Sequence, residues 1–331
     1  MKAVQIERPG FAVLADLDLR KLKEDEVLIK VMACGICGTD IHIFRGKYIG
    51  DYPIVPGHEF SGIVEKVGPN VSRLAAGDRV AVEPNISCDN CRNCLNNRQN
   101  FCENWQALGV TLQGGMAQYV IAPEKAVFNI ADLAFEFGAF VEPLSCVIHG
   151  IEKVDFSLAD RVLIMGAGPI GLLFLQLLQL QGAANVSVLE NQASRSELAM
   201  KFGADQVKEK IINFKEELFD AVIDATGKIE LMEKSLEYIR PGGRILLFGV
   251  PPANKKMSID AVQLFRKGLT LMSSFTSVRN TYQAVSLLQA GKIHVSEIIS
   301  HKLPLNEFKR GAELIEHGME SVKKVILLPQ E

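Results

Sequence analysis

The chain has little charge of one sign and no cluster of basic residues. Its 331 residues include 36 Lys plus Arg and 39 Asp plus Glu, a formal net charge of −3, and no block of five or six basic residues occurs. The long-range field that draws proteins to nucleic acid or to acidic membranes is therefore missing. We expect neither a nucleic acid nor a membrane as partner.

Long apolar segments are also lacking. The longest apolar stretch, Ile170 to Leu180, is interrupted by Gln176 and Gln179 and falls short of the roughly 20 residues of a membrane span. The amino terminus has no apolar core of the roughly 7–15 residues of a secretory signal. These absences predict a cytoplasmic protein, whose 7 cysteines are then better interpreted as metal ligands or catalytic thiols than as disulfides.

Two patterns of predicted elements divide the chain. Residues 1–140 hold short β-like runs broken by Gly, Pro, Asn and Asp, which indicates a mostly-β domain. Over residues 141–274 apolar strands alternate with helices, which is typical of a doubly wound parallel sheet. The expected strands are Glu26–Met32, Gly62–Val67, Arg79–Val82, Gln118–Ile121, Arg161–Met165, Asn185–Leu189, Asp220–Asp224, Arg244–Val250 and Lys324–Leu328. The expected helices are Pro169–Gln181, Ser194–Phe202, Ile229–Ile239, Asn280–Ala290 and Leu305–His317.

A glycine-rich run, Gly166-Ala167-Gly168-Pro169-Ile170-Gly171, directly follows the strand Arg161–Met165. Its three glycines suit a tight turn, a close backbone approach to pyrophosphate and close helix packing, and the following helix presents free N–H groups to the anion. A plain strand-to-helix turn is the alternative. However, an acid, Glu190, ends the next strand 19 residues past Gly171. Together these features predict a bound dinucleotide.

The acid also bears on which dinucleotide binds. The Glu190 carboxylate could accept hydrogen bonds from both ribose hydroxyls of adenosine and would repel a 2′-phosphate. Arg195 is either a solvated helix residue, a neighbour of the adenine or a partner for a phosphate. We predict NAD, with NADP less favoured.

Cys88, Cys91, Cys94 and Cys102 form the spacing C-x2-C-x2-C-x7-C in a polar loop. Four thiolates within 15 residues meet the tetrahedral demand of zinc and leave no open position. The ferredoxin run instead closes with x3 and a proline after the last cysteine, and disulfides lack the support of a secretory signal. The pattern predicts a structural zinc site.

A second metal constellation involves Cys37. The run Cys34-Gly35-Ile36-Cys37 is compatible with a redox pair, but no βαβ unit surrounds it. His58 and Glu59 could join Cys37 as zinc ligands, and three protein ligands with one open position are the composition of a catalytic zinc site. On residue types alone, His58 could equally be a hydrogen-bonded interior histidine.

These motifs together resemble the zinc-dependent medium-chain dehydrogenase/reductase family, in its polyol and threonine dehydrogenase branch. The matching segments follow the family's order: Cys37–His42, Gly57–Gly62 continuing through Gly68 and Val71 to Gly77–Val80, the four-cysteine loop, Gly114–Tyr119 and Gly166–Gly171. The resemblance implies a GroES-like catalytic domain over residues 1–140. It further implies a Rossmann-type NAD-binding domain over 141–274 and a return to the catalytic domain over 275–331.

The resemblance implies a catalytic zinc on Cys37, His58 and Glu59, with Glu142 close enough to ligate the ion or to hold its water. Adjacent residues point to opposite faces of an ideal strand. His58 and Glu59 can therefore share one ion only if the backbone bends there, and the ligating acid, Glu59 or Glu142, can differ between states.

Two further sets of residues gain roles from the resemblance. Thr39 and His42 match the family's proton relay, which leads from the bound alcohol to water while a hydride passes to the nicotinamide. Gly249, Val250 and Phe275 are implied as additional cofactor contacts.

The substrate is predicted from one loop and one short segment. The loop Ile43–Pro53 is short, like that of arabitol- or mannitol-type dehydrogenases. Thr276-Ser277 stands where sorbitol dehydrogenases carry Arg-Tyr, which disfavours sorbitol. Arg45 and Lys47 could contact a sugar phosphate, although exposed basic residues on loops are usually solvated.

The resemblance therefore predicts a homodimeric or homotetrameric enzyme with two zinc ions per chain. It would oxidise a secondary alcohol of a polyol or sugar alcohol to the ketone with NAD. The alternatives are an L-threonine 3-dehydrogenase, a sugar-phosphate alcohol dehydrogenase and, in another class, a non-catalytic zinc- and nucleotide-binding protein.

Overall fold

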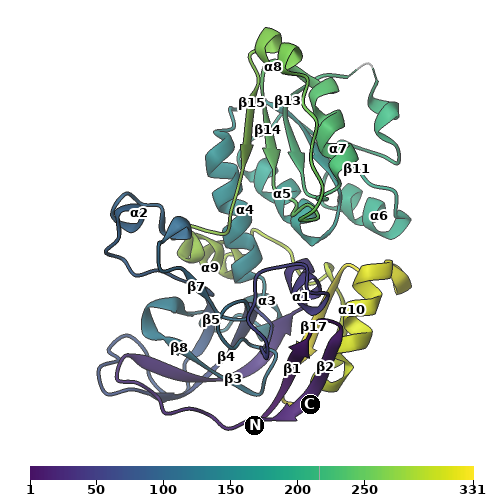
Figure 1. The fold of residues 1–331 in the computed structure, drawn as a ribbon. Coiled ribbons are helices and arrows are strands. Elements are labelled where there is room, and N and C mark those ends of the chain that lie inside the picture. The colour runs from purple at the N-terminus through teal and green to yellow at the C-terminus, as the bar shows by residue number, and fades with distance from the viewer. Residues whose placement is uncertain (216) are drawn as a thin grey trace. The chain divides into compact units, whose positions relative to one another are not determined.

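The computed structural model describes residues 1–215 and 217–331 and divides them into two compact units. The first unit comprises Met1–Ser145 and Ser277–Glu331, and the second comprises Cys146–Thr276. The second unit is therefore inserted into the sequence of the first. Both ends of the chain belong to the first unit, where Figure 1 marks them.

The first unit is built on a seven-stranded sheet in the order β16-β17-β3-β4-β5-β9, with β8 also paired to β3. Alternate residues of β3 are buried over much of its length, as expected for a strand with one face on a core. The chain's last strand, β17, pairs antiparallel with β3, so segments from both ends of the sequence form one sheet. The strands are β1 Lys2–Arg8, β2 Phe11–Asp16, β3 Glu26–Gly35, β4 Glu59–Val67, β5 Arg79–Val82, β6 Asn85–Ile86, β7 Gln106–Ala107, β8 Tyr119–Pro123, β9 Val127–Asn129, β16 Ile299–Pro304 and β17 Lys324–Leu328.

The first unit also contains several helices. They are α1 Gly38–Phe44, α2 Arg92–Leu95, α3 Phe135–Gly138, α9 Thr281–Gln289 and α10 Phe308–His317, with α4 Val141–Val154 running from the first unit into the second. Single 3-10 turns lie at Gln99–Phe101, Glu124–Ala126, Leu305–Glu307 and Met319–Ser321. Across the described ranges, no helix has both the length and the apolar composition that a membrane crossing requires.

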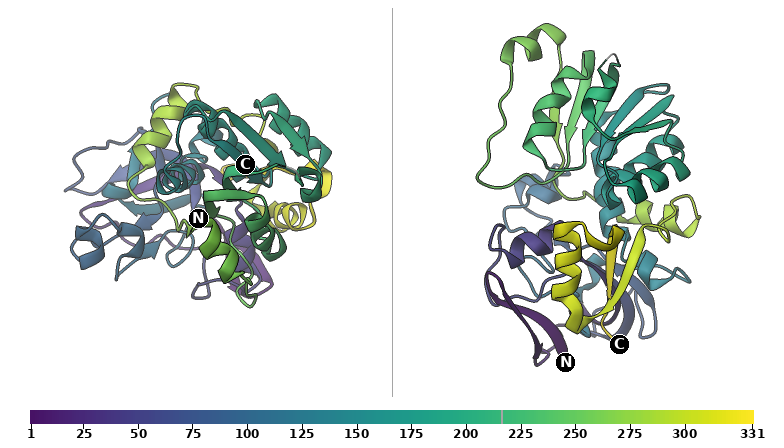
Figure 2. Two further views of the ribbon diagram at one scale, coloured as in Figure 1. Left: turned by 90° about the horizontal axis from the view of Figure 1, so that it is seen from above. Right: turned by 90° about the vertical axis from the view of Figure 1, so that its right-hand side faces the viewer.

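The second unit contains a parallel six-stranded sheet in the order β12-β11-β10-β13-β14-β15. Helices lie on both faces of this sheet (Figure 2), and the middle residues of its central strands, Val162–Ile164 and Ala221–Ile223, are accordingly apolar and buried. The strands are β10 Arg161–Met165, β11 Asn185–Leu189, β12 Gln206–Lys208, β13 Phe219–Asp224, β14 Ile239–Leu247 and β15 Thr270–Ser273. The helices are α5 Pro169–Leu180, α6 Ala193–Lys201, α7 Ile229–Lys234 and α8 Ala261–Lys267, with 3-10 turns at Ile211–Phe214 and Ser235–Glu237. This is the Rossmann strand order, and the predicted fold class is confirmed.

One predicted helix is wrong at its end. The helix expected over Ile229–Ile239 stops at Lys234, and Ile239 begins β14. The segment Pro241-Gly242-Gly243, whose residue types are typical of a turn, separates the expected helix from the expected strand Arg244–Val250 but lies inside β14, at a shift in its register against β13. Pairing of Ile239 with Phe219 extends the strand through this segment, so the sheet overrides the local turn signal.

Candidate active site and metal centres

Three candidate metal ligands converge in the first unit. Single ligand atoms of Cys37, His58 and Glu59 lie within 4.8 Å of one another. Cys37 caps the start of α1, and β4 begins only at Glu59, so His58 precedes the strand. The alternation of side chains along a strand therefore does not separate His58 from Glu59. A thiolate, an imidazole and a carboxylate at this spacing suit zinc with a fourth position open.

Asp40, which the sequence analysis did not select, ties the two ligand-bearing segments together. Its fully buried carboxylate accepts hydrogen bonds from the backbone N–H of Cys37 at 2.8 Å and of Gly57 at 2.9 Å. Asp40 Oδ1 also lies 3.4 Å from Nδ1 of His58, a buried atom without a hydrogen-bond partner among the described residues. A carboxylate behind a ligating imidazole fixes the orientation of its ring, so Asp40 completes a donor set that fits a metal.

The charge of Asp40 favours the protonated form of His58. Burial by itself would lower the pKa of His58, but Asp40 and then Cys37 raise it well above its ordinary value. A metal on His58 has to displace this proton, since the ligating imidazole is neutral.

Besides the candidate metal, Glu59 has a cationic partner in the protein itself. Lys324 of β17 donates a hydrogen bond to its carboxylate, and the two residues are only 4% and 2% exposed. A Cβ at Gly35 would lie 2.4 Å from Oε2 of Glu59 and 2.8 Å from Cε of Lys324, so a larger residue there would force the side chains of this pair to shift. Burial alone would lower the pKa of Lys324, but Glu59 raises it above its ordinary value. Glu59 is therefore shared between a buried ammonium group and the candidate metal position.

Cys34, the other cysteine of the C-x-x-C run, is not part of the three-ligand group. It is fully buried on β3, and burial followed by the charges of Asp40 and Glu59 raises its pKa well above the ordinary value. The two thiols of this run are therefore chemically unlike.

The remaining predicted catalytic residues lie in the same unit. Thr39 and His42 are half-buried on α1, three residues apart and so on one face of the helix. Burial and the positive charge of Lys47 lower the pKa of His42, so its imidazole is neutral at pH 7. Glu142 is buried in the first turn of α4 and lies outside the three-ligand group.

The four-cysteine loop forms a separate cluster. Ligand atoms of Cys88, Cys91, Cys94 and Cys102 lie within 4.8 Å of one another, around α2. Backbone N–H groups, that of Asn90 first, lower the pKa of the Cys88 thiol to about 6. Four converging thiols, one of them readily ionised, fit a closed structural zinc site.

Trp105, the one tryptophan of the chain, lies beside this cluster, so its fluorescence can report loss of the metal. Its backbone N–H donates to the carbonyl of Cys102 at 3.1 Å, and its indole donates to Oδ1 of Asn85 at 3.1 Å. We expect a chelator to remove the zinc, loosen the loop and shift tryptophan emission to longer wavelength, since the indole becomes hydrated. Cys94→Ala should show the shifted emission without chelator. Unchanged emission in a Cys94→Ala protein that has lost one zinc would contradict this expectation.

The second unit holds a cavity of about 640 Å³ at the carboxyl ends of its central strands. Gly166, Gly168, Glu190 and Arg195 line it, which brings together four of the residues predicted to bind the cofactor. Pro169, Ile170 and Gly171 form the first turn of α5 beside them, and a Cβ at Gly171 would lie 1.9 Å from the carbonyl oxygen of Gly166. Open α/β sheets bind nucleotides at this edge.

Glu190 is held rigidly at this cavity. Its Oε2 accepts a hydrogen bond from the N–H of Ala167 at 2.9 Å, and Oε1 accepts from Asn191 at 2.8 Å and Gln192 at 2.9 Å. The carboxylate is thus fixed against the glycine loop before any ligand binds. Burial lowers the pKa of Arg195, which lines the same cavity from α6.

The cavity also contains residues that sequence reasoning missed. Thr226 and Lys228 follow β13 and line it. Their signal was position alone, at the carboxyl end of a central parallel strand. The other predicted cofactor contacts, Gly249, Val250 and Phe275, are not among the described residues that line this cavity. Gly249 and Val250 follow β14, and a Cβ at Gly249 would lie 2.1 Å from the nitrogen of Gly227. Phe275 follows β15 and is half-buried.

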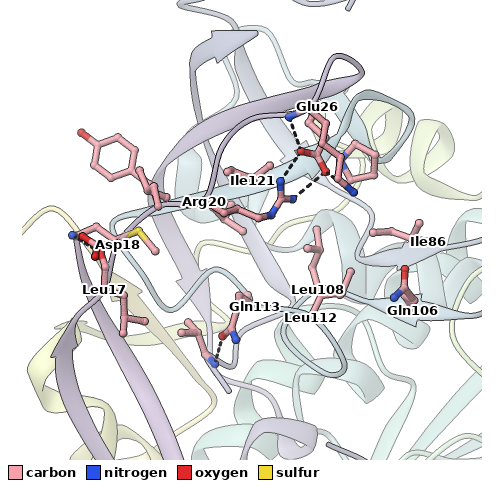
Figure 3. Close-up of a pocket in the computed structure, with 18 of the residues that line it drawn as sticks. Leu17, Asp18, Arg20, Glu26, Ile86, Gln106, Leu108, Leu112, Gln113 and Ile121 are labelled. Carbon is pink, nitrogen blue, oxygen red and sulfur yellow. Dashed lines mark hydrogen bonds and ion pairs between the residues drawn. The ribbon is translucent and has the colours of Figure 1, made fainter. Parts of the chain in front are cut away.

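Another cavity, of about 730 Å³, lies in the first unit (Figure 3). Of the described residues that line it, none is a predicted catalytic, metal or cofactor residue. Two of its charged residues pair with each other: Arg20 donates to both carboxylate oxygens of Glu26 at 2.6 and 2.8 Å. Gln113 likewise accepts from the backbone N–H of Val55 at 2.6 Å.

Comparison with known families agrees with both units. Residues 23–132 match the alcohol dehydrogenase GroES-like domain, and residues 169–290 match the zinc-binding dehydrogenase model. A GroES-like unit with converging metal ligands, interrupted by a Rossmann-type unit, defines an alcohol dehydrogenase of the zinc-binding class.

Individual relatives cover nearly the whole chain. D-arabinitol dehydrogenase 1 of Uromyces fabae is 33% identical over 95% of this chain and 93% of its own. D-arabitol-phosphate dehydrogenase of Enterococcus avium is 35% identical over 100% of this chain and 99% of its own. L-threonine 3-dehydrogenase of Caldanaerobacter subterraneus is 35% identical over 94% of each. The chain belongs to the zinc-binding dehydrogenase family and is an oxidoreductase, which confirms the predicted resemblance.

Solved structures support the same assignment. A protein from Sinorhizobium meliloti described as a zinc-binding dehydrogenase, with NADP bound, has a TM-score of 0.94 at 33% identity over 99% of both chains. A protein from Escherichia coli described as a short chain alcohol dehydrogenase, complexed with NADH, has a TM-score of 0.92 at 29% identity over 99% of both chains. Zinc and a nicotinamide dinucleotide are thus the cofactors of this family's fold.

Proposed function

We propose that this protein oxidises a secondary alcohol of a polyol or sugar alcohol to the ketone, with NAD as hydride acceptor. The observation that carries the proposal is the convergence of Cys37, His58 and Glu59 next to α1. Relatives named for D-arabinitol and D-arabitol phosphate support the substrate class.

Residues of the first unit would hold the metal and move the proton of the alcohol. A zinc ion, when bound, supplies a Lewis acid that eases loss of the alcohol proton. Cys37, His58 and one of the acids Glu59 and Glu142 would hold it. The hydroxyl of Thr39 would receive the alcohol proton, and the neutral imidazole of His42, on the same helix face, would pass it towards water.

The preference for NAD depends on Glu190. Its fixed carboxylate suits the two ribose hydroxyls of NAD and would repel a 2′-phosphate. One of the two compared structures contains NADP and the other contains NADH. The preference for NAD over NADP therefore depends on the Glu190 carboxylate and not on these relatives.

The first test is NADH formation by zinc-replete protein with pentitols, hexitols, polyol phosphates, L-threonine and simple secondary alcohols, with NADP in a parallel series. We expect turnover of a polyol with NAD. Turnover of L-threonine alone would favour the second candidate, which the L-threonine 3-dehydrogenase relatives support. Failure with every polyol in protein shown to contain zinc would overturn the proposal.

The pH dependence tests the relay. Because the pKa of His42 lies below its ordinary value of 6.5, we expect kcat/KM to rise with pH through that pKa and then level off. Lys47→Gln removes a positive charge that disfavours the imidazolium, so the pKa of His42 should rise and the acid limb should move to higher pH. His42→Asn should abolish the limb. An acid limb that is the same in all three proteins would show that His42 is not in the relay.

We also propose that two copies associate through the second unit. Strand β15 is an edge strand, whose unpaired backbone groups can pair with a second copy. The adjoining helix α8 exposes Phe265 by 85% and Val262 by 58%, an apolar pair that such contact would cover. Sedimentation should give a dimer or a larger even oligomer, and Phe265→Asp should shift it towards monomer. A monomeric wild-type protein would overturn this proposal.

A further inference from the structure

Helix α1, which carries the two relay residues, is too short to hold its position by itself. It has 7 residues, and isolated helices shorter than about 12–15 residues are marginal in water. Its amino-terminal end is fixed next to the metal ligands, because Asp40 accepts hydrogen bonds from Cys37 and Gly57. His42 lies towards the other end, so the place of its imidazole depends on how the carboxyl-terminal end is held.

Helix α10 holds that carboxyl-terminal end. The two helices pack against each other (Figure 1), and the buried rings of Phe44 and Phe308 meet edge to face with their centroids 5.8 Å apart. Beside this contact, the guanidinium group of Arg45, directly after α1, donates to both carboxylate oxygens of Glu316 on α10, at 3.2 and 2.6 Å. Paired bonds of this kind fix the relative orientation of the two groups as well as their distance.

The pair between Arg45 and Glu316 is ionised and partly exposed. Its hydrogen bonds lower the pKa of Glu316, so the carboxylate is charged at neutral pH. The pairing uses the geometry that Arg45 would otherwise offer to a sugar phosphate. The side chains are 38% and 30% exposed, and pairs of this exposure add little to stability. What the pair contributes is therefore position, since it joins α1 to a helix near the other end of the chain.

The other polar contacts of this end are single bonds to the backbone. The N–H of Gly10 donates to the carbonyl of Phe44 at 2.6 Å. The hydroxyl of Tyr52 donates to the carbonyl of Ile43. Each of these bonds fixes one point of the helix, whereas the doubly bonded, planar pair also resists its rotation.

We propose that Glu316 is a positioning residue for the proton relay: through Arg45 it fixes the carboxyl-terminal half of α1 and thereby the imidazole of His42. This inference rests on the proposed function, because it assumes that the alcohol proton passes from Thr39 to His42. Proton transfer needs the two groups within hydrogen-bond reach, directly or through one water. Thr39 is nearer to Cys37 along the helix, so loosening the other end displaces the imidazole and leaves the metal ligands in place.

Arg45→Gln and Glu316→Gln each remove the paired contact. We expect each to lower kcat/KM for the alcohol about tenfold, less than the loss in His42→Asn, because general acid–base catalysis contributes about a hundredfold or more and the imidazole is still present. Zinc content and the Kd of NAD should stay unchanged. Full activity in both variants would overturn the proposal.

Arg310→Gln is the matched control. Arg310 also lies on α10 and pairs with Glu307 at 2.8 Å and with Glu320 at 3.7 Å, but neither pair reaches α1. The variant therefore removes a cation of the same helix without loosening the relay, and it should keep the wild-type kcat/KM. A loss as large as that of Glu316→Gln would overturn the specific role of the contact with α1.

Two rescue experiments separate a displaced imidazole from a general loss of folding. A bulky buffer amine, N-ethylmorpholine, can accept the proton from solution, so raising its concentration should restore most of the activity of Arg45→Gln and leave the wild type unchanged. The exchanged pair, Arg45→Glu with Glu316→Arg, rebuilds the contact in the opposite direction and should recover most of the lost kcat/KM. A defect that neither the amine nor the exchanged pair relieves would overturn the proposal.

Amide hydrogen exchange tests the same contact without turnover. Exchange in residues 41–45 should be faster in Arg45→Gln and Glu316→Gln than in the wild type, and it should be unchanged in residues 57–62 beside the metal ligands. Equal exchange of α1 in all three proteins would overturn the proposal whatever the substrate is. Faster exchange in the variants, with a wild type that oxidises no polyol, would support the contact and refute the proposed function. The two failures are therefore distinguishable.

Discussion

Replacing Cys37 by alanine is expected to remove one of two zinc ions per chain and to lower kcat/KM at least a thousandfold. The thiolate is one of three converging ligands, and two ligands hold zinc poorly against a chelator. The Lewis acid contributes several kcal/mol to stabilising the alkoxide, and each 1.4 kcal/mol corresponds to a factor of ten. Zinc content by atomic emission and NADH formation measure the two effects.

Cys34→Ala is the matched control for this substitution. Cys34 lies three residues earlier on the same segment, and its thiol is outside the three-ligand group. It should keep both zinc ions and most of the activity. If Cys37→Ala retained two zinc ions and near-normal turnover, the catalytic metal would have to be elsewhere.

Replacing Lys324 by methionine is expected to destabilise the first unit more strongly without zinc than with it. The substitution leaves the carboxylate of Glu59 buried without its ammonium partner, which typically costs about 3–5 kcal/mol. Bound zinc offers Glu59 another cation, so the loss should shrink when the metal is present. Urea unfolding of the variant and the wild type, each with zinc and with a chelator, measures both differences.

Two further variants isolate the ion pair. Lys302→Met breaks the exposed contact of Lys302 with Glu136, and such surface pairs contribute about 1 kcal/mol or less. The double variant Glu59→Gln with Lys324→Met should recover much of the stability lost by Lys324→Met alone, because no unpaired charge remains. If Lys302→Met and Lys324→Met lowered the free energy of unfolding equally, the buried pair would contribute no more to stability than the exposed one.

The parallel sheet was predictable because its strands are buried on both faces and therefore appear as short apolar runs. Strands β10 and β11 begin and end at the predicted residues. Helix α1, by contrast, has 7 residues, too few for a helical period to show. The edge strands β15 and β16 were also missed. An edge strand is stabilised by pairing with its one neighbouring strand, and that neighbour is known only from the folded chain.

The same limit applies within the site. Cys37, His58 and Glu59 could be named because the metal requires those residue types. Lys324 begins an apolar strand far along the sequence, and only the pairing of β17 with β3 brings it to Glu59. Asp40 has a local signal, the third position of a helix, but its bond to Gly57 depends on the fold.

The insertion of one unit into the other also sets an order for biosynthesis. The nucleotide-binding unit is one continuous segment, Cys146–Thr276, whereas the first unit needs β17 beside β3. Domains tend to fold as units while the chain emerges from the ribosome. The second unit can therefore close while the sheet of the first still lacks its last strand. Lys324 can reach Glu59 only after the whole second unit has been synthesised, so this buried pair beside the metal centre forms after the nucleotide-binding unit.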